Sequence, residues 1–165
     1  MRRLTFLAAA LLWLAAPAVA ADAPYAKLGN LLGTPKLAYS FGPKDKSALL
    51  LKFVPAGEDD KAWTKMTTVS IVKVLPKDTE AAGRGVIAKL RDELKKRQVK
   101  VETFAESDIA DPASCYFEYS ADGEHQKGIV YSPTPGFVTV AQVGAKSIHG
   151  ITQHDVAVLK SLIHR

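Results

Sequence analysis

The sequence of 165 residues has a single cysteine, Cys115, and few long apolar runs. One cysteine excludes an internal disulfide and a Cys-x-x-Cys redox pair. After residue 20 every apolar run is short and is interrupted by Lys, Gly or Pro. A membrane-spanning helix needs about 20 apolar residues, so we expect none in this part of the chain. The protein must then be stabilised by burial of a core, for which a domain of this size suffices.

Motifs of common chemistries are also missing. The sequence has no Gly-x-Ser-x-Gly, phosphate-binding loop or dinucleotide fingerprint. The acidic segment 58–60 lacks the spacing of a calcium loop and is followed by Lys61, which favours a solvated loop. His149 and His154 are five residues apart, which is not the same-face spacing of a two-histidine zinc site. We therefore expect no metal site and no cofactor.

The first twenty residues carry an export signal. Arg2 and Arg3 form a positive region, residues 4–16 are apolar, and Ala18-Val19-Ala20 matches the small-x-small pattern of a cleavage site. No cysteine near Ala20 offers a site for lipid attachment. We therefore expect cleavage after Ala20 and release into the periplasm. Loss of the two arginines lowers the net charge of +5 by two, which gives little support for a nucleic-acid partner.

Beyond the signal we predict a flexible lead-in over residues 21–34 and one domain over residues 35–165. Segments rich in β-branched, aromatic or alternating apolar residues predict strands at 36–41, 48–54, 64–75, 100–104, 114–120, 124–131 and 137–143. Cys115, Phe117 and Tyr119 share one face of their strand, which we expect to be the core side. The dipeptide Asp122-Gly123 is typical of a two-residue hairpin turn.

Two amphipathic helices accompany these strands. Val86, Ile87, Leu90 and Leu94 form one apolar stripe, in a helix that we expect Asp78 and Thr79 to cap. A second helix is expected after Thr152, with Asp155 at its third position and Ile151 and Val156 spaced for a hydrophobic staple. Short turns favour antiparallel pairing. The sequence therefore predicts an α+β fold, an antiparallel sheet of about six or seven strands flanked by two helices. Whether the helices share a face stays open.

This order and size of elements resembles the Mog1/PsbP-like group, in which an antiparallel sheet is flanked by helices. The resemblance covers most of residues 35–165. Gly57-Glu58 together with the segment Trp63 to Val69 is also similar to a recurrent segment of small, uncharacterised exported proteins of Gram-negative bacteria. The resemblance implies a periplasmic binding or accessory domain. It implies no catalytic residues, because members of the fold group serve unrelated partners.

Trp63 and Glu58 are the candidate ligand-binding residues. Trp63 stands where an irregular polar loop enters a strand, and an exposed tryptophan at such a junction is a suitable binding platform. The alternative is that Trp63 packs over the edge of the core. The basic run Lys95, Lys96, Arg97 and Lys100 is interpreted as a solvated helix face that is also suited to an anionic surface.

These observations favour an exported, non-enzymatic binding or accessory protein that recognises an envelope protein or a small ligand. The alternatives are an envelope hydrolase or thiol enzyme that uses Cys115 with His125, and an inhibitor of an envelope enzyme. Cys115 lacks the neighbouring cations or helix N-terminus that activate a thiol, so we expect it to behave as a small apolar side chain.

Overall fold

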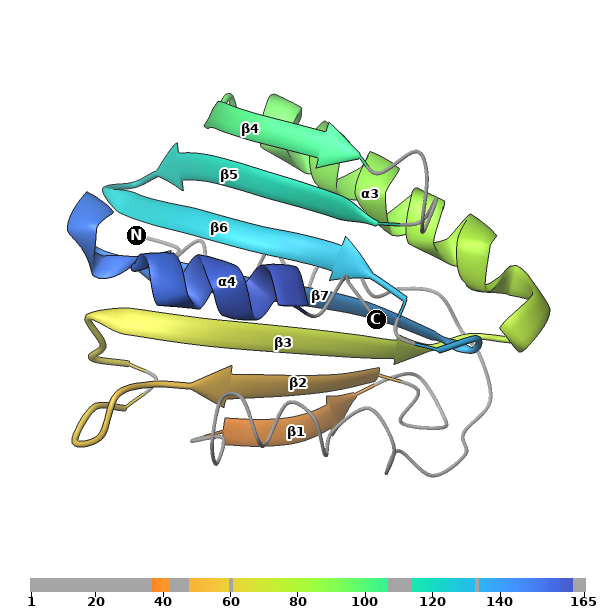
Figure 1. Ribbon diagram of the computed structural model, residues 1–165, viewed down its shortest axis with the longest axis horizontal. Helices are drawn as coiled ribbons and strands as arrows, with labels where there is room; N and C mark the ends of the chain where they lie inside the picture. The colour runs from red at the N-terminus through yellow and green to blue at the C-terminus, as the bar shows by residue number, and fades with distance from the viewer. Residues whose placement is uncertain (1–36, 42–47, 60, 107–113, 133, 162–165) are drawn as a thin grey trace.

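The computed structural model describes residues 37–41, 48–59, 61–106, 114–132 and 134–161. The expected signal peptide and the lead-in lie outside these residues. The described residues form one open sheet and two α-helices, which confirms the predicted α+β fold (Figure 1). Their strands are β1 (Leu37–Phe41), β2 (Ala48–Phe53), β3 (Lys65–Lys73), β4 (Lys100–Glu106), β5 (Cys115–Ala121), β6 (Glu124–Tyr131) and β7 (Phe137–Ala145).

All seven strands pair antiparallel, in the order β1-β2-β3-β7-β6-β5-β4. The last strand in sequence, β7, therefore lies between β3 and β6. Eight of its nine residues are buried, because successive side chains point to opposite faces and both faces are covered. Val138 and Val140 belong to one core, whereas Ala141 and Val143 belong to the other.

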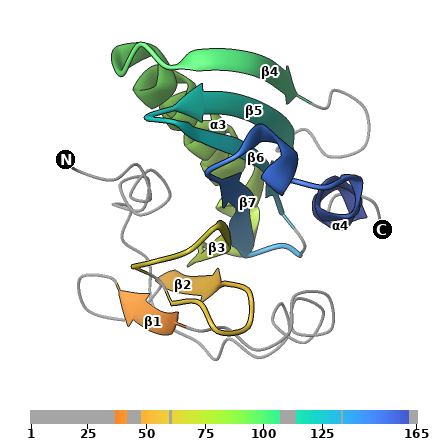
Figure 2. The same ribbon diagram turned by 90° about the vertical axis from the view of Figure 1, so that its left-hand side faces the viewer.

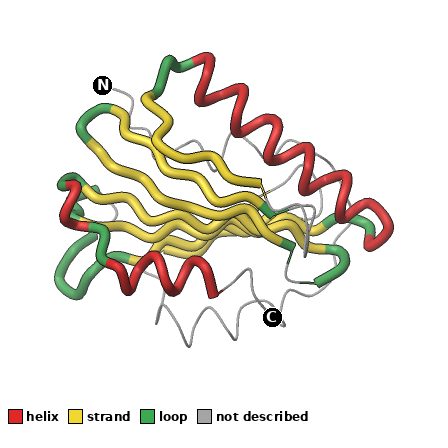
Figure 3. The backbone as a smooth tube through the Cα atoms, turned by 45° about the horizontal axis from the view of Figure 1, so that its top comes forward, coloured by secondary structure: helices red, strands yellow, loops and turns green. Residues whose placement is uncertain are grey.

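The two helices cover opposite faces of the sheet (Figures 2 and 3). The long helix α3 (Thr79–Lys96) packs on the face that we call the α3 side. The short helix α4 (Gln153–Ser161) packs on the other face, the α4 side. The α3-side core contains Val86, Ile87, Leu90, Leu94, Cys115, Phe117, Tyr119, Val130, Val138 and Val140. The α4-side core contains Leu51, Phe53, Val69, Ile71, Ile129, Tyr131, Ala141, Val143, Ala145, Ile151 and Leu159.

The start of α3 differs from the prediction. A short 3-10 helix, η2 (Pro76–Asp78), precedes it, and the Asp78 side chain makes no capping hydrogen bond. The Thr79 hydroxyl instead donates to the carbonyl of Pro76 and accepts from the N–H of Gly136, at 2.7 Å each. Because Thr79 bonds the turn before β7, it fixes the helix to the sheet instead of capping it.

The start of α4 agrees with the prediction. The Thr152 N–H donates to Asp155 at 2.8 Å, and the Asp155 N–H donates to the Thr152 hydroxyl at 3.2 Å. This reciprocal pair is a capping box. Ile151 and Val156 both pack in the α4-side core, as a hydrophobic staple requires. A second helix of 3-10 type, η3 (Ile148–Gly150), lies between β7 and α4.

Candidate functional site

Polar side chains from distant parts of the sequence meet at one end of the sheet. We call it the hairpin end, because the β5–β6 hairpin lies there. Antiparallel pairing brings the ends of β2, β5 and β7 and the starts of β3, β4 and β6 to this end (Figure 1). One row of paired residues, formed by Lys65, Ala145, His125, Ser120 and Lys100, crosses five strands there on the α4 side. Four of its five members carry a polar group.

The Glu58–Trp63 loop forms one part of the hairpin end. Glu58 accepts hydrogen bonds from the hydroxyl and the backbone N–H of Thr64, both at 2.6 Å. These bonds, led by that of the hydroxyl, hold the pKa of Glu58 below its usual range. Trp63 is only 3 % exposed, and the Lys146 ammonium lies 5.4 Å from the centre of its ring. Both side chains therefore stabilise the loop; their contact with a ligand stays a prediction.

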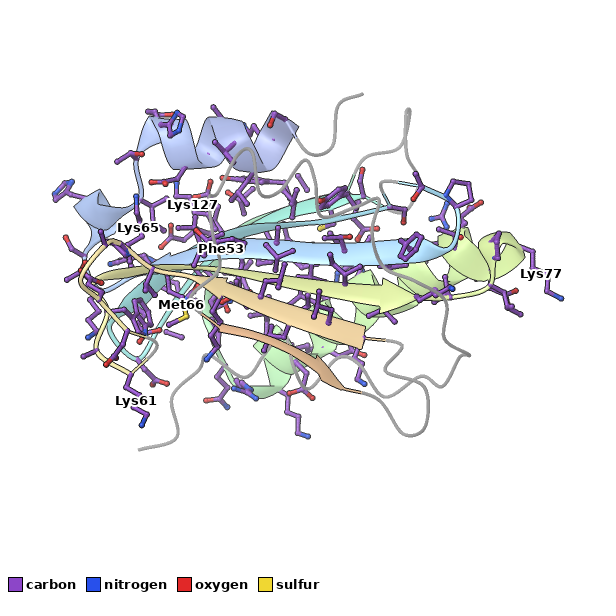
Figure 4. The ribbon with its side chains drawn as sticks, turned by 90° about the horizontal axis from the view of Figure 1, so that it is seen from below. Phe53, Lys61, Lys65, Met66, Lys77 and Lys127 are labelled. Atoms are coloured by element: carbon purple, nitrogen blue, oxygen red, sulfur yellow. The ribbon has the colours of Figure 1, made fainter. Side chains whose placement is uncertain are left out.

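Lys65 links β3 to α4 at the same end. Its ammonium lies 3.0 Å from the carboxylate of Asp155, whose side chain is 15 % exposed. Burial raises the pKa of Asp155. Hydrogen bonds from Thr152 and from Lys65 outweigh this effect, so its pKa lies below its usual range. The capping box and the ion pair thus share one carboxylate, which joins the helix start to the sheet (Figure 4 shows Lys65 beside α4).

A second pair of charges lies one row further along the α4 side. The Lys127 ammonium is 3.1 Å from the carboxylate of Glu118, which also accepts a hydrogen bond from the hydroxyl of Tyr116. Lys160 of α4 lies 5.1 Å above the ring of Tyr116. Burial raises the pKa of Glu118, but the bonds from Tyr116 and Lys127 hold it below its usual range. The polar surface thus continues from the hairpin end beneath the edge of α4.

Cys115 and His125 lie on opposite sides of the sheet. Cys115 is 1 % exposed in the α3-side core, and its thiol lies 3.6 Å from the carbonyl of Tyr116. Burial raises its pKa to about 12. His125 belongs to the α4-side row at the hairpin end. The structure does not bring the two residues together, and a thiol of this pKa is protonated near neutral pH, whereas catalysis needs the thiolate.

His125 instead contacts Ser120. The Ser120 hydroxyl lies 2.9 Å from Nδ1 of His125 and donates to the carboxylate of Glu102 at 2.8 Å. A serine nucleophile requires the histidine between the hydroxyl and the carboxylate, so that the ring removes the serine proton. In this chain the serine lies between the other two residues, and Glu102 accepts the hydrogen bond of its hydroxyl directly. The cluster resembles a hydrogen-bonded surface network more than a hydrolase triad.

A pocket of ≈ 500 Å³ opens at the hairpin end, at the edge of the sheet formed by β4. It is lined by residues 97–100, where α3 turns into β4, and by residues 120–122 of the β5–β6 hairpin. We call it the edge pocket. Sequence reasoning noted the basic run and the Asp122-Gly123 turn separately, but not that they meet. The turn that joins them could not be recognised, because Gln98 occupies the left-handed position after α3 where a glycine would have indicated it.

Neither the protein-family models nor the curated proteins include a match to this sequence. In the part of the chain that the structure describes, no group of three or more His, Cys, Asp or Glu side chains is suited to hold a metal ion. Within the same residues, neither helix is both long and apolar enough to cross a membrane. The functional interpretation therefore rests on the geometry of the hairpin end.

Proposed function

We propose that this chain is a non-enzymatic binding or accessory protein of the periplasm, and that it binds its ligand or envelope partner at the hairpin end. The observation that carries the proposal is the edge pocket beside a row of paired residues in which four of five strands contribute a polar side chain. Binding sites are typically concave and lined by a few polar groups that several segments hold in place. The Glu58–Trp63 loop borders the same end, across the sheet from the pocket.

Binding is favoured over catalysis by the state of the two nucleophiles discussed above. Cys115 is buried on the side of the sheet away from His125, and the Ser120 hydroxyl donates its hydrogen bond to Glu102 and not to the histidine ring. A binding surface needs neither an activated nucleophile nor a base. The periplasmic location rests on the signal pattern that ends at Ala20.

Partner capture from the envelope fraction tests the proposal. Trp63→Ala is unsuitable, because removal of a buried tryptophan costs about 3–5 kcal/mol and threatens folding. Lys146→Glu reverses an exposed charge at the hairpin end, whereas Lys77→Glu reverses one at the far end (Figure 4). We expect a partner captured by the natural protein to be lost with Lys146→Glu and retained with Lys77→Glu. Equal capture by all three proteins would place the binding surface elsewhere.

A further inference from the structure

Two cationic side chains line the edge pocket from adjacent elements. Arg97 is the C-cap residue of α3, and Lys100 is the first residue of β4. Nε of Arg97 lies 3.6 Å from the carboxylate of Glu93, which is too long for a good hydrogen bond. Lys100 has no ion pair or side-chain hydrogen bond with any other described residue. Lys100 therefore brings to the pocket a positive charge without a close partner among the described residues, and Arg97 brings one that is paired with Glu93 but has N–H donors left for a ligand.

The backbone around the pocket is left-handed at two positions. Gln98 has a φ of 53° and Asp122 a φ of 52°, and no other non-glycine residue in the described ranges has a positive φ. This left-handed conformation costs about 1–2 kcal/mol at Gln98, a cost that glycine avoids, whereas Asp122 stands in the Asp-Gly hairpin turn that requires it. Both residues line the edge pocket. Strain of this kind concentrates at functional sites, where a particular side chain is needed at a particular place.

The turn at Gln98 has a defined geometry. The Val99 N–H donates to the carbonyl of Leu94, and the Gln98 N–H donates to that of Lys95, at 3.1 and 3.0 Å. This is a Schellman motif, in which the left-handed position is usually glycine. The motif uses two of the last carbonyls of α3 internally. These bonds reduce the partial negative charge at the C-terminus of the helix, which would otherwise repel an anion beside Arg97.

We propose that the edge pocket binds a ligand that carries a compact oxyanion, a phosphate or carboxylate group, through Arg97 and Lys100. The guanidinium offers two parallel N–H donors, and the ammonium adds a point charge. The Asp122 carboxylate in the same lining weakens the binding of a bare anion. It accepts a hydrogen bond from a ligand that also carries a hydroxyl or ammonium group. The inference rests on the proposed binding function and names the chemistry of its ligand.

Inorganic phosphate is the probe for this site. We would titrate the purified protein with phosphate at constant ionic strength and follow its backbone amides by NMR. The amides of Gln98, Lys100 and Asp122 are expected to shift together along one binding curve. A unit charge about 5 Å from the anion in water changes the affinity roughly fourfold. The double variant Arg97→Gln, Lys100→Gln should therefore bind roughly sixteenfold more weakly, and Asp122→Asn roughly fourfold more tightly.

Lys77→Gln is the matched control, since it removes one exposed charge at the opposite end of the sheet (Figure 4). Its phosphate affinity should equal that of the natural protein. Absence of localised shifts, or an equal loss of affinity in Lys77→Gln and in the double variant, would overturn the proposal. Unchanged phosphate affinity in Asp122→Asn would also overturn the proposal, because the carboxylate of Asp122 would then not act on the bound anion.

Vesicles distinguish the two sources of such a group. Co-sedimentation with phosphatidylglycerol vesicles, absent with phosphatidylcholine and lost in the double variant, would identify a lipid headgroup as the source. Phosphate binding without co-sedimentation would identify a small dissolved ligand. The two proposals can also fail separately. If Lys146→Glu abolishes partner capture but phosphate shifts no amide of the edge pocket, the oxyanion site is refuted and the proposed function remains.

Discussion

Asp155 holds α4 to the sheet through contacts that a single substitution removes. Asp155→Ala deletes the carboxylate that accepts the bonds of Thr152 and of Lys65. Loss of a capping side chain costs about 1 kcal/mol, and a partly buried charged hydrogen bond contributes about 1.5–3 kcal/mol. One-third of the Lys65 side chain is exposed, so solvent weakens its bond. We therefore expect a loss of about 2 kcal/mol, or about 4–8 °C in Tm.

Urea unfolding followed by tryptophan fluorescence measures this loss. Trp63 is buried, and the other tryptophan, Trp13, lies in the segment that we expect to be removed on export. The matched control is Asp92→Ala on the exposed face of α3, which should change the unfolding free energy by less than about 0.5 kcal/mol. A loss below about 0.5 kcal/mol for Asp155→Ala, or an equal loss for both variants, would refute the assigned role.

The pH dependence gives a second readout for the same carboxylate. Because the folded pKa of Asp155 lies below its ordinary value of 3.8, the charged form is favoured in the native state. Its contribution to stability is complete above the pKa of the unfolded chain and is lost as pH falls through the folded pKa. The stability difference between the natural protein and Asp155→Asn should therefore be constant at neutral pH and shrink below about pH 4. A difference that does not change with pH would contradict the charged role.

Three further substitutions or reactions test other parts of the fold. Gln98→Gly should raise the free energy of unfolding, measured by urea unfolding, by up to about 1 kcal/mol, because glycine fits the left-handed position of the Schellman motif. A lower free energy of unfolding than that of the natural protein would contradict the assigned turn. Gly128→Ala should destabilise by about 1–3 kcal/mol, since its Cβ would lie 2.3 Å from the ring of Phe117; an unchanged Tm would show that the ring moves away freely. Cys115 should resist alkylation at neutral pH until the protein unfolds, because it is 1 % exposed with a pKa of about 12; fast labelling of native protein would restore the thiol-enzyme alternative.

Local patterns in the sequence predicted the elements well. The stripe from Val86 to Leu94 is buried in the α3-side core. Asp122 and Gly123 form the β5–β6 turn with positive φ at both residues, as such a turn requires. Observed strand bounds differ from the predicted ones by up to two residues, as at β3, which ends at Lys73. These features depend on neighbours in sequence, and side-chain periodicity reports them directly.

Long-range arrangement was not predictable in the same way. No local signal states that β7 pairs with β3 and β6, or that the helices take opposite faces, because both depend on residues far apart in sequence. The edge pocket was missed for a related reason. Its backbone turn uses glutamine where glycine is usual, so Gln98 carries no recognisable turn signal. For Trp63 the sequence left two possibilities, an exposed binding platform or packing over the edge of the core. The structure shows that the side chain is buried.

The central place of β7 has a consequence for how the chain reaches its native state. The sheet consists of two three-stranded meanders, β1-β2-β3 and β4-β5-β6, and β7 is the strand that joins them. Until residues 137–145 are available, β3 and β6 each present an unpaired inner edge, and the two halves have no common strand. Contacts of such large sequence separation form late, because the intervening chain must first be ordered. Completion of the sheet therefore awaits synthesis of residues 137–145, and until then the two halves cannot form a common core.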